Sequence, residues 1–341
     1  MVRKIKLCLV GAGSIGRRHL RILSEREDTA LMVVDPSEAC REKAREIAPQ
    51  VPFYASMEEA VRVGGAEAVI LATPHGMHAS MALEAISLGV HVFCEKPMSD
   101  SLEECVAMMQ AAKQSDKVFS VGFMFRFDPF IRKVKALIEE GRIGNVVHYA
   151  SRFATYNTLL CSVTRHQEHT PFALAMDCIH DSDLLYHITG KMPDTVLARA
   201  YKAGDLPLSS PQNVIDTLYG WNEATMGAHV HFNYVQHPQI HTLEVVGDLG
   251  YIQGDFMTAS STLGTRDGKI ERFTDLRGDF DNVYRAEWNE FLRAVRGERK
   301  AENPPEEAVF STLLMHGQIE SAQSGAPVDL HRLAERYGFS F

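Results

Sequence analysis

The sequence predicts an α/β domain with a parallel sheet, followed by an α+β domain with a large, mainly antiparallel open sheet. Over the first 124 residues, short apolar runs alternate with helical patterns, which is typical of consecutive βαβ units. Between about residues 195 and 275, strand-like runs follow one another directly, which indicates an antiparallel sheet. We therefore expect two domains, residues 1–124 and 125–341.

The strands expected in the first domain are short and apolar, as in a parallel sheet buried between helices. They cover 5–10, 31–34, 68–72, 90–94 and 118–121, and the helices cover 14–24, 37–48, 75–88 and 102–114. Ligands of open α/β sheets bind at the carboxyl ends of the strands. Residues that directly follow these strands are therefore candidates for a ligand site.

The second domain shows helical patterns near its two ends and strand patterns between them. Helices are expected at 129–140, 171–188, 283–296 and 305–321, and strands at 146–153, 196–201, 213–221, 225–234, 241–246 and 251–256. The sequence leaves open whether the last helices extend this domain or pack back onto the first.

Composition excludes several classes of partner. The chain has 341 residues and a formal net charge of −9, without the basic stripe of a nucleic-acid binder. No apolar run reaches the roughly 18–20 residues of a membrane span, and the apolar start of the chain enters a glycine loop without a cleavage site, which favours a strand over a signal peptide. The six cysteines form no C-x-x-C pair, which favours reduced thiols. We therefore expect a cytoplasmic protein with a small-molecule substrate.

The first expected strand ends in a glycine-rich turn, residues 11–16, that fits G-x-G-x-x-G. It opens a helix, and an acid ends the next strand, which is the context of a Rossmann dinucleotide site. Gly11 permits a tight turn, Gly13 lets the backbone approach a pyrophosphate, and Gly16 lets the helix pack close to the strand. Ser14 and Ile15 begin the helix, whose N-terminal N–H groups favour phosphate.

Asp35 is the acid at the end of the second strand, where its carboxylate can accept hydrogen bonds from both ribose hydroxyls of NAD. The same charge would repel the 2′-phosphate of NADP, and the next three residues contain no arginine. We therefore expect NAD as the cofactor. In the alternative, Asp35 is only a turn or capping residue, because Pro36 and Ser37 also begin a helix.

An ordered set of motifs follows the glycine loop. It comprises Ala72-Thr73-Pro74, His78, Phe93-Cys94-Glu95-Lys96-Pro97, Arg126-Phe127-Asp128-Pro129, Asp177-Cys178-Ile179-His180-Asp181-Ser182-Asp183 and Val246-Gly247-Asp248-Leu249-Gly250. With the glycine loop, this set resembles the Gfo/Idh/MocA family of NAD(P)-dependent sugar and polyol oxidoreductases over nearly the whole chain. The Glu-Lys-Pro element at a strand end is its most specific member.

The resemblance implies a nicotinamide over the carboxyl ends of the first sheet. The residues that would surround the cofactor are Thr73, Pro74, His78, Glu95, Lys96 and Pro97, with Arg126 near the cofactor or the domain junction. The Lys96–Pro97 peptide bond is often cis in such proteins, and a cis X-Pro bond is energetically tolerable.

Hydride transfer from a secondary alcohol needs one group to stabilise the developing alkoxide and another to accept the hydroxyl proton. Lys96 can supply positive charge at a strand's carboxyl end, and His180 can take a proton near neutral pH. Asp177, three residues before His180 on an expected helix, would share its face and orient the imidazole or bind a sugar hydroxyl. The alternatives are a solvated Lys96 and a His180 that only pairs with Asp177 or Asp183.

The sequence departs from the family pattern just before this helix. Many relatives carry the acid four residues before the histidine, where this chain has Met176. A glycine pair is also common there, whereas this chain has Phe172-Ala173-Leu174-Ala175. The role of Asp177 and the shape of the substrate pocket therefore stay open.

Further candidates for substrate contact lie outside these motifs: Arg152, Tyr156, Arg165, His166 and Tyr234. The polar run 165–169 is interpreted as a substrate loop or a solvated loop. Its histidines show no rigid ligand spacing and hydride transfer needs no metal, so we expect none. Tyr156 could equally be a core aromatic.

These observations predict an NAD-dependent dehydrogenase that oxidises a secondary hydroxyl of a sugar, polyol or sugar derivative. The alternatives are a redox-neutral sugar-processing enzyme with tightly held NAD and an NAD-binding sensor, although the joint presence of Lys96 and His180 argues against the sensor. A broad sheet with helices mostly on one face also predicts a homodimer or homotetramer, with Trp221, Phe232 and Tyr234 on candidate strands of that sheet.

Overall fold

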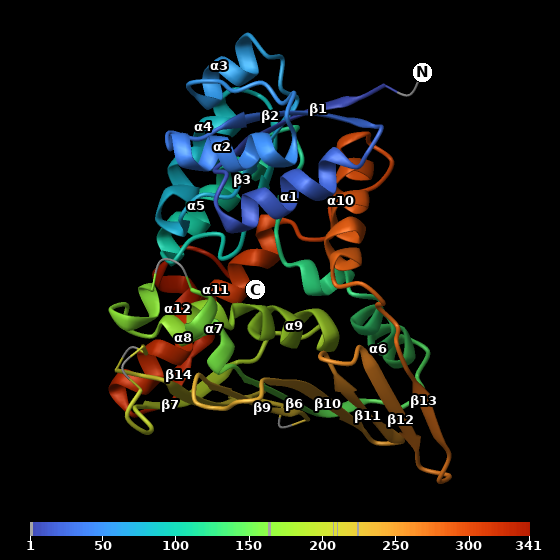
Figure 1. Cartoon of the computed structure of the whole chain (residues 1–341). Coiled ribbons are helices and arrows are strands. Elements are labelled where there is room, and N and C mark those ends of the chain that lie inside the picture. Colours follow the sequence, from blue (N-terminus) through green and yellow to red (C-terminus); the bar gives the residue numbers. More distant parts are fainter. Residues whose placement is uncertain (1–2, 163–164, 207, 210, 224) are drawn as a thin grey trace. The chain divides into compact units, whose positions relative to one another are not determined.

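The computed structural model describes residues 3–162, 165–206, 208–209, 211–223 and 225–341, which form two compact units (Figure 1). The first unit comprises Met1–Met124 and Phe280–Thr312, and the second comprises Phe125–Asp279 and Leu313–Phe341. A segment from late in the chain thus completes the unit that contains the first sheet.

The first unit is built on a parallel sheet in the order β2-β1-β3-β4-β5. Its strands are β1 (Ile5–Val10), β2 (Thr29–Val34), β3 (Ala68–Leu71), β4 (His91–Cys94) and β5 (Phe119–Val121). Its connecting helices are α1 (Ser14–Ser24), α2 (Glu38–Ile47), α3 (Met57–Arg62), α4 (His78–Ser87) and α5 (Leu102–Lys113), with a short 3₁₀-helix, η1 (His75–Met77). The predicted parallel sheet is confirmed. Helix α3 was not predicted, because a helix of six residues is too short to show a helical period.

Helix α10 (Asp281–Val295) completes the core of this unit, and α11 (Pro305–Ser324) follows it. The apolar residues of α10 recur every three or four positions, so that Trp288 and Phe291 share one buried face. The Trp288 ring lies 4.4 Å from the ring of Phe93 on β4, centroid to centroid. Burial of large aromatic side chains is the main source of stability at such a contact.

The second unit is built on nine strands in the order β13-β12-β11-β10-β6-β9-β8-β7-β14. They are β6 (Val146–Ala154), β7 (Thr195–Tyr201), β8 (Val214–Gly220), β9 (Gly227–Asn233), β10 (Ile240–Gly247), β11 (Gly250–Asp255), β12 (Ser260–Thr265), β13 (Ile270–Phe273) and β14 (Val328–Asp329). Only the described pair β6–β9 is parallel, so the predicted, mainly antiparallel sheet is confirmed. Strands β12 to β14 were not predicted, and their small, polar or short segments carry a weak alternation signal.

The helices of this unit are α6 (Pro129–Glu139), α7 (Tyr156–Cys161), α8 (Ala173–Asp177), α9 (Ile179–Thr189) and α12 (Leu330–Arg336), with 3₁₀-helices η2 (Met124–Phe127) and η3 (His166–Glu168). The single helix expected at 171–188 is wrong, because the chain breaks at Cys178 into α8 and α9. Asp177 and His180 therefore lie on different helices and do not share one helical face.

The nine-stranded sheet has one buried face and one open face, since side chains alternate along each strand. On β6, Ser151 is buried and hydrogen-bonds Asp181 of α9, whereas Arg152 is exposed on the other side. Helices α7, α8 and α9 lie on the same side of the sheet in Figure 1. The open face has a hollow of about 700 Å³ whose lining includes Arg152, His229, His231 and Glu244.

The three aromatic residues that the sequence suggested for an uncovered sheet face are not exposed on the open face. Phe232 on β9 and Tyr234, just after that strand, are both fully buried. Trp221 follows β8 and is partly buried. An alternating pattern identifies the two faces of a strand but does not say which one receives the helices.

Every helix in the described part of the chain is too short or too polar to span a bilayer.

The first testable consequence concerns Glu287 on α10, which is 1% exposed and whose two carboxyl oxygens have no hydrogen-bond partner among the described residues. Burial, reinforced by the nearby charge of Glu95, raises the pKa of Glu287 well above its ordinary value. In the unfolded chain this carboxyl ionises at its ordinary pKa, while in the folded chain it stays protonated. The free energy of unfolding therefore falls as pH rises above that ordinary pKa.

We expect Glu287→Gln, which removes this ionisation, to raise the Tm at about pH 8 and to have a smaller effect at about pH 4, where both states hold the proton. Thermal unfolding at the two pH values measures the difference. A variant that is destabilised more at pH 8 than at pH 4 would show that Glu287 is ionised and partnered in the folded protein.

Candidate cofactor and active site

The glycine loop has the geometry of a site for a bound phosphate group. Gly11 has a φ of +93°, and a Cβ there would lie 2.7 Å from the carbonyl oxygen of Ala72. A Cβ on Gly16 would lie 2.0 Å from the Gly11 carbonyl oxygen, so only glycine lets α1 pack this close to the loop. Gly13, at the N-cap of α1, faces open space, with no atom within 4 Å of an added Cβ and no side chain capping the helix. Ser14 and Ile15 form the first turn of α1, whose N–H groups and dipole favour an anion.

Asp35 directly follows β2 and is tied to the glycine loop. Its Oδ2 accepts a hydrogen bond from the Ala12 N–H at 2.7 Å, and its Oδ1 accepts one from the Ser37 N–H at 2.8 Å. The cap of α2 is Ser37, whose side chain accepts from the Cys40 N–H. Asp35 thus shapes the turn beside the loop, and the capping role belongs to another residue.

The other predicted cofactor residues of this unit follow β3 and β4. Thr73 and Pro74 come after β3, and Glu95, Lys96 and Pro97 come after β4. Because the strands are parallel, these residues lie at the same sheet edge as Gly11 and Asp35. The Lys96–Pro97 peptide bond is cis, as the resemblance implied.

His78 lies behind this edge. It is 1% exposed, with Nδ1 2.9 Å from the Pro97 carbonyl oxygen and Nε2 2.9 Å from the Thr73 carbonyl oxygen. Burial lowers its pKa, against the opposing effect of the two carbonyl groups. The imidazole therefore bridges the segments after β3 and β4, a supporting position that differs from the expected one lining the cofactor.

Glu95 is buried, yet its carboxylate has partners on both oxygens. Oε2 accepts a hydrogen bond from the Lys96 N–H at 3.1 Å, and Oε1 lies 2.6 Å from Nε2 of His19. Burial alone would raise the pKa of Glu95, but the hydrogen bond from His19 and the charge of Lys96 outweigh it and lower the pKa. The carboxylate is thus an ionised group that is hydrogen-bonded to the backbone of Lys96.

In the second unit, Asp177 at the end of α8 is surrounded by polar side chains. Its Oδ2 accepts hydrogen bonds from the Tyr234 hydroxyl at 2.5 Å and from Gln167 Nε2 at 2.9 Å, and its Oδ1 lies 3.2 Å from His166 Nε2. Burial, followed by the charge of Asp177, raises the pKa of Tyr234, so the phenol stays protonated and donates. Three predicted substrate residues therefore meet in one cluster, together with Gln167, which was not predicted.

His180, in the first turn of α9, is 9% exposed, and its ring lies edge-on to Phe125 at 4.9 Å between centroids. The next acid, Asp181, bonds Ser151 and lies 3.1 Å from Nε2 of His241. These buried contacts set the rotation of α9 about its axis, and with it the direction of His180.

Arg126 has a different partner from the expected one. Its guanidinium donates to both carboxylate oxygens of Asp183, through Nε at 2.8 Å and Nη2 at 2.6 Å. Both side chains are buried, so this bidentate ion pair ties η2 to α9. The predicted contact of Arg126 with the cofactor has no support from this geometry.

Three other predicted substrate residues lie apart from the Asp177 cluster. Arg152 is on the open face of β6, opposite α9, and donates to Gln236, so the structure contradicts its assignment to a site with His180. The assignment failed because successive side chains of a strand point to opposite faces of the sheet. Ser151 therefore points toward α9, and Arg152 points away from it. Arg165 is exposed and pairs with Glu168, and Tyr156, at the start of α7, lies edge-on to His237.

Two comparisons with protein families identify the class of protein that this fold and site define. Residues 5–123 match the oxidoreductase family with an NAD-binding Rossmann fold, and residues 135–330 match the C-terminal α/β domain of the same family. The chain therefore belongs to the Gfo/Idh/MocA family of oxidoreductases. It is an NAD-dependent oxidoreductase, and the predictions of family, fold and cofactor are confirmed.

Individual relatives are similar along different lengths. An uncharacterized oxidoreductase, YrbE of Bacillus subtilis, is 29% identical over 208 residues, 58% of each chain, so the match covers less than two thirds of that relative. An inositol 2-dehydrogenase of Burkholderia multivorans is 24% identical over 98% of each chain. Among solved structures, scyllo-inositol dehydrogenase from Lactobacillus casei, with bound NAD(H) and scyllo-inositol, has a TM-score of 0.81 at 22% identity, covering 96% of this chain and 99% of that one.

The role of Asp35 can be tested by cofactor preference. We expect Asp35→Ser to weaken NAD binding about 10- to 100-fold, because a hydrogen bond to a charged group contributes about 1.5–3 kcal/mol. NADP should bind better than to the parent, because the repulsive carboxylate is gone. Titration of NADH and NADPH fluorescence measures both changes. Equal catalytic efficiency of the parent protein with the two cofactors would contradict the assignment.

Proposed function

We propose that the protein is a dehydrogenase that oxidises a secondary hydroxyl of a polyol, sugar or sugar derivative. The observation that carries the proposal is Lys96 at the end of β4, anchored through its backbone to the ionised Glu95 and at the same sheet edge as the glycine loop. The name of the full-length relative, inositol 2-dehydrogenase, supports a cyclic polyol as one such substrate.

The proposed reaction uses two side chains, a cation that stabilises negative charge and a base that accepts a proton. Bound NAD supplies the hydride acceptor for the carbon that bears the hydroxyl. The Lys96 ammonium stabilises negative charge on the hydroxyl oxygen, and the neutral His180 imidazole accepts its proton as the C–H bond breaks and the C=O bond forms. Each group loses its effect if it is in the wrong protonation state, so turnover depends on pH.

The cluster around Asp177 supports a role in substrate binding. A carboxylate that already accepts hydrogen bonds from Tyr234 and Gln167 is held in one orientation. We propose that Asp177 accepts a hydrogen bond from a substrate hydroxyl, with His166 beside it. Tyr156 and Arg165 stay predictions as further contacts.

Substitution of Lys96 tests the proposed reaction. A spectrophotometric screen of NAD reduction with inositols, aldoses, amino sugars and glycosides first identifies a substrate. We then expect Lys96→Met to lower kcat about 10²- to 10³-fold, the usual cost of removing one preorganised electrostatic contact, with NADH binding largely kept. His180→Asn should also slow turnover and remove the acidic limb of the pH profile, since Asn cannot accept the proton.

Near-normal turnover of Lys96→Met would contradict the proposed chemistry. A parent protein that binds NADH but reduces NAD with no screened substrate would favour a sensor. Co-purified NAD that exchanges slowly would favour a redox-neutral reaction.

We also propose that the open face of the nine-stranded sheet joins copies of this chain into a homodimer or homotetramer. On this face Leu218 is 55% exposed and lies beside Leu197, which is 37% exposed. On the same face Arg199 lies opposite Asp216, so this surface carries charges of both signs and can be complementary to a second copy of itself across a two-fold axis.

Sedimentation measures the oligomeric state. The parent should sediment as a multiple of 38.0 kDa, and Leu218→Glu should shift it toward monomer because the interface would bury an unpaired charge. Val63→Glu is the matched control, because Val63 is 75% exposed in the first unit. A parent that is monomeric at micromolar concentration would contradict this proposal.

A further inference from the structure

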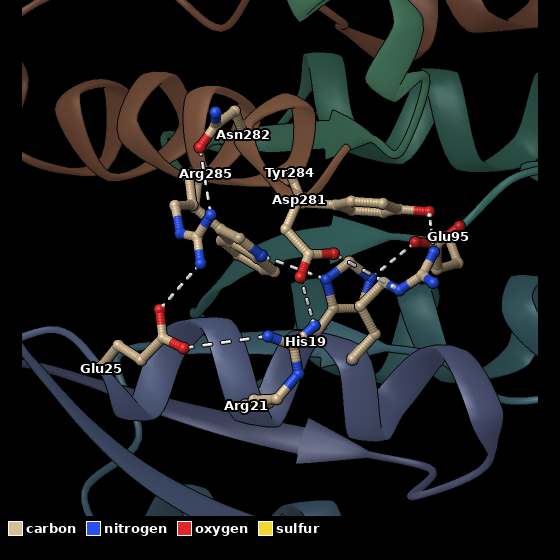
Figure 2. Close-up of polar contacts among 10 residues, drawn as sticks. His19, Arg21, Glu25, Glu95, Asp281, Asn282, Tyr284 and Arg285 are labelled. Carbon is tan, nitrogen blue, oxygen red and sulfur yellow. Dashed lines mark hydrogen bonds and ion pairs between the residues drawn. The ribbon is translucent and has the colours of Figure 1, made fainter. Parts of the chain in front are cut away.

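A line of buried hydrogen bonds runs from α10 to the backbone of Lys96. The Trp288 indole Nε1 lies 3.1 Å from Nδ1 of His19, and Nε2 of His19 lies 2.6 Å from Oε1 of Glu95. Oε2 of Glu95 accepts from the Lys96 N–H at 3.1 Å. Figure 2 shows His19 on α1 with its ring directed toward Glu95, beneath α10. All four residues belong to the first unit.

The donors and acceptors along this line have only one consistent arrangement. An indole N–H can only donate, so Nδ1 of His19 must accept and carry no proton. The remaining proton of the neutral ring then lies on Nε2 and is donated to the Glu95 carboxylate. Trp288 therefore selects the tautomer of His19 that donates to Glu95.

The parts of this line have little room to move. His19 is 0% exposed, and its ring makes edge contacts with those of Phe93, Tyr284 and Trp288 at 5.2–5.7 Å between centroids. A Cβ on Gly122 would lie 3.2 Å from the Glu95 carboxyl carbon, so glycine leaves the space that the carboxylate needs.

Ion pairs between side chains of α1 and α10 also hold these two helices together. Arg21 donates to Asp281 at 2.5 Å, and Arg285 lies 3.2 Å from Glu25 (Figure 2). The guanidinium of Arg18 also lies 5.2 Å from the centre of the Tyr284 ring. These contacts fix the helix that presents the Trp288 N–H.

We propose that His19 and Trp288 are positioning residues for Lys96. They orient the Glu95 carboxylate, which holds the backbone of the residue whose ammonium acts on the substrate. The inference rests on the proposed function of Lys96. It assigns to α10 an indirect effect on turnover, exerted through this line of hydrogen bonds.

The test compares two replacements of His19 in the full-length protein. Gln can accept from Trp288 through its amide oxygen and donate to Glu95 through its amide nitrogen, whereas Leu keeps the bulk and loses both links. We expect His19→Leu to lower kcat about 10- to 100-fold, because a displacement of about 1 Å at a reacting group costs up to about 10²-fold. His19→Gln should keep kcat within ~3-fold of the parent, and NADH binding should change little in either variant.

A role in core packing alone predicts the opposite order, because Leu is the better buried residue. A kcat for His19→Leu equal to or above that of His19→Gln therefore overturns the proposal. If His19→Leu does not fold, Trp288→Phe takes its place, since it keeps a buried aromatic ring and removes the N–H together with part of the indole. An unchanged kcat in Trp288→Phe would then overturn the proposal.

A double-mutant cycle separates this inference from the proposed function. If His19 acts through Lys96, adding His19→Leu to Lys96→Met should lower kcat by less than ~2-fold further, whereas full additivity would contradict the proposal. Normal turnover of Lys96→Met alone would instead mean that the proposed function fails. Glu290→Gln is the matched control, because Glu290 is buried on α10 two residues after Trp288 but pairs with Arg293 and Arg299, and we expect its kcat to equal that of the parent.

Discussion

The buried charge of Glu95 is the interaction on which the first unit depends. A carboxylate taken out of water is costly unless hydrogen bonds and nearby charges replace its hydration. Here the partners come from three parts of the chain: His19 on α1, the N–H of Lys96 after β4, and, through His19, Trp288 on α10. The glycine loop at the start of α1 and the Lys96 segment are therefore connected by the packing of one acid.

The second unit uses the same principle around α9. Two of its acids, Asp181 and Asp183, are buried, and each has partners on a different element: Ser151 and His241 on the sheet for the first, and Arg126 on η2 for the second. A helix held by two such contacts in different directions cannot rotate about its axis without breaking one of them. His180, whose ring lies edge-on to Phe125, gains a fixed direction in this way.

Much of the fold could be predicted because its signals are local. The glycine pattern, the alternation of strands and helices, and the acid after β2 are all read within short windows, and the structure confirms the two sheets that they predict. The break at Cys178 carries no glycine or proline, so the sequence there looks like one helix. The side chains around Asp177 were only partly predictable, because Gln167 and Tyr234 reach it from other elements, 10 and 57 residues away, and no spacing encodes that meeting. His19 was missed for the same reason, since its two partners lie 76 and 269 residues away.

The return of Phe280–Thr312 to the first unit has a consequence for how the protein is made. A ribosome releases the parallel sheet early, but Trp288 and Phe291, which complete its core, emerge only after the whole nine-stranded sheet apart from β14 has been synthesised. Until then His19 lacks the indole that selects its tautomer and Glu95 is less enclosed. The first 124 residues therefore remain an incomplete domain, without these two aromatic side chains in its core, until α10 has been synthesised.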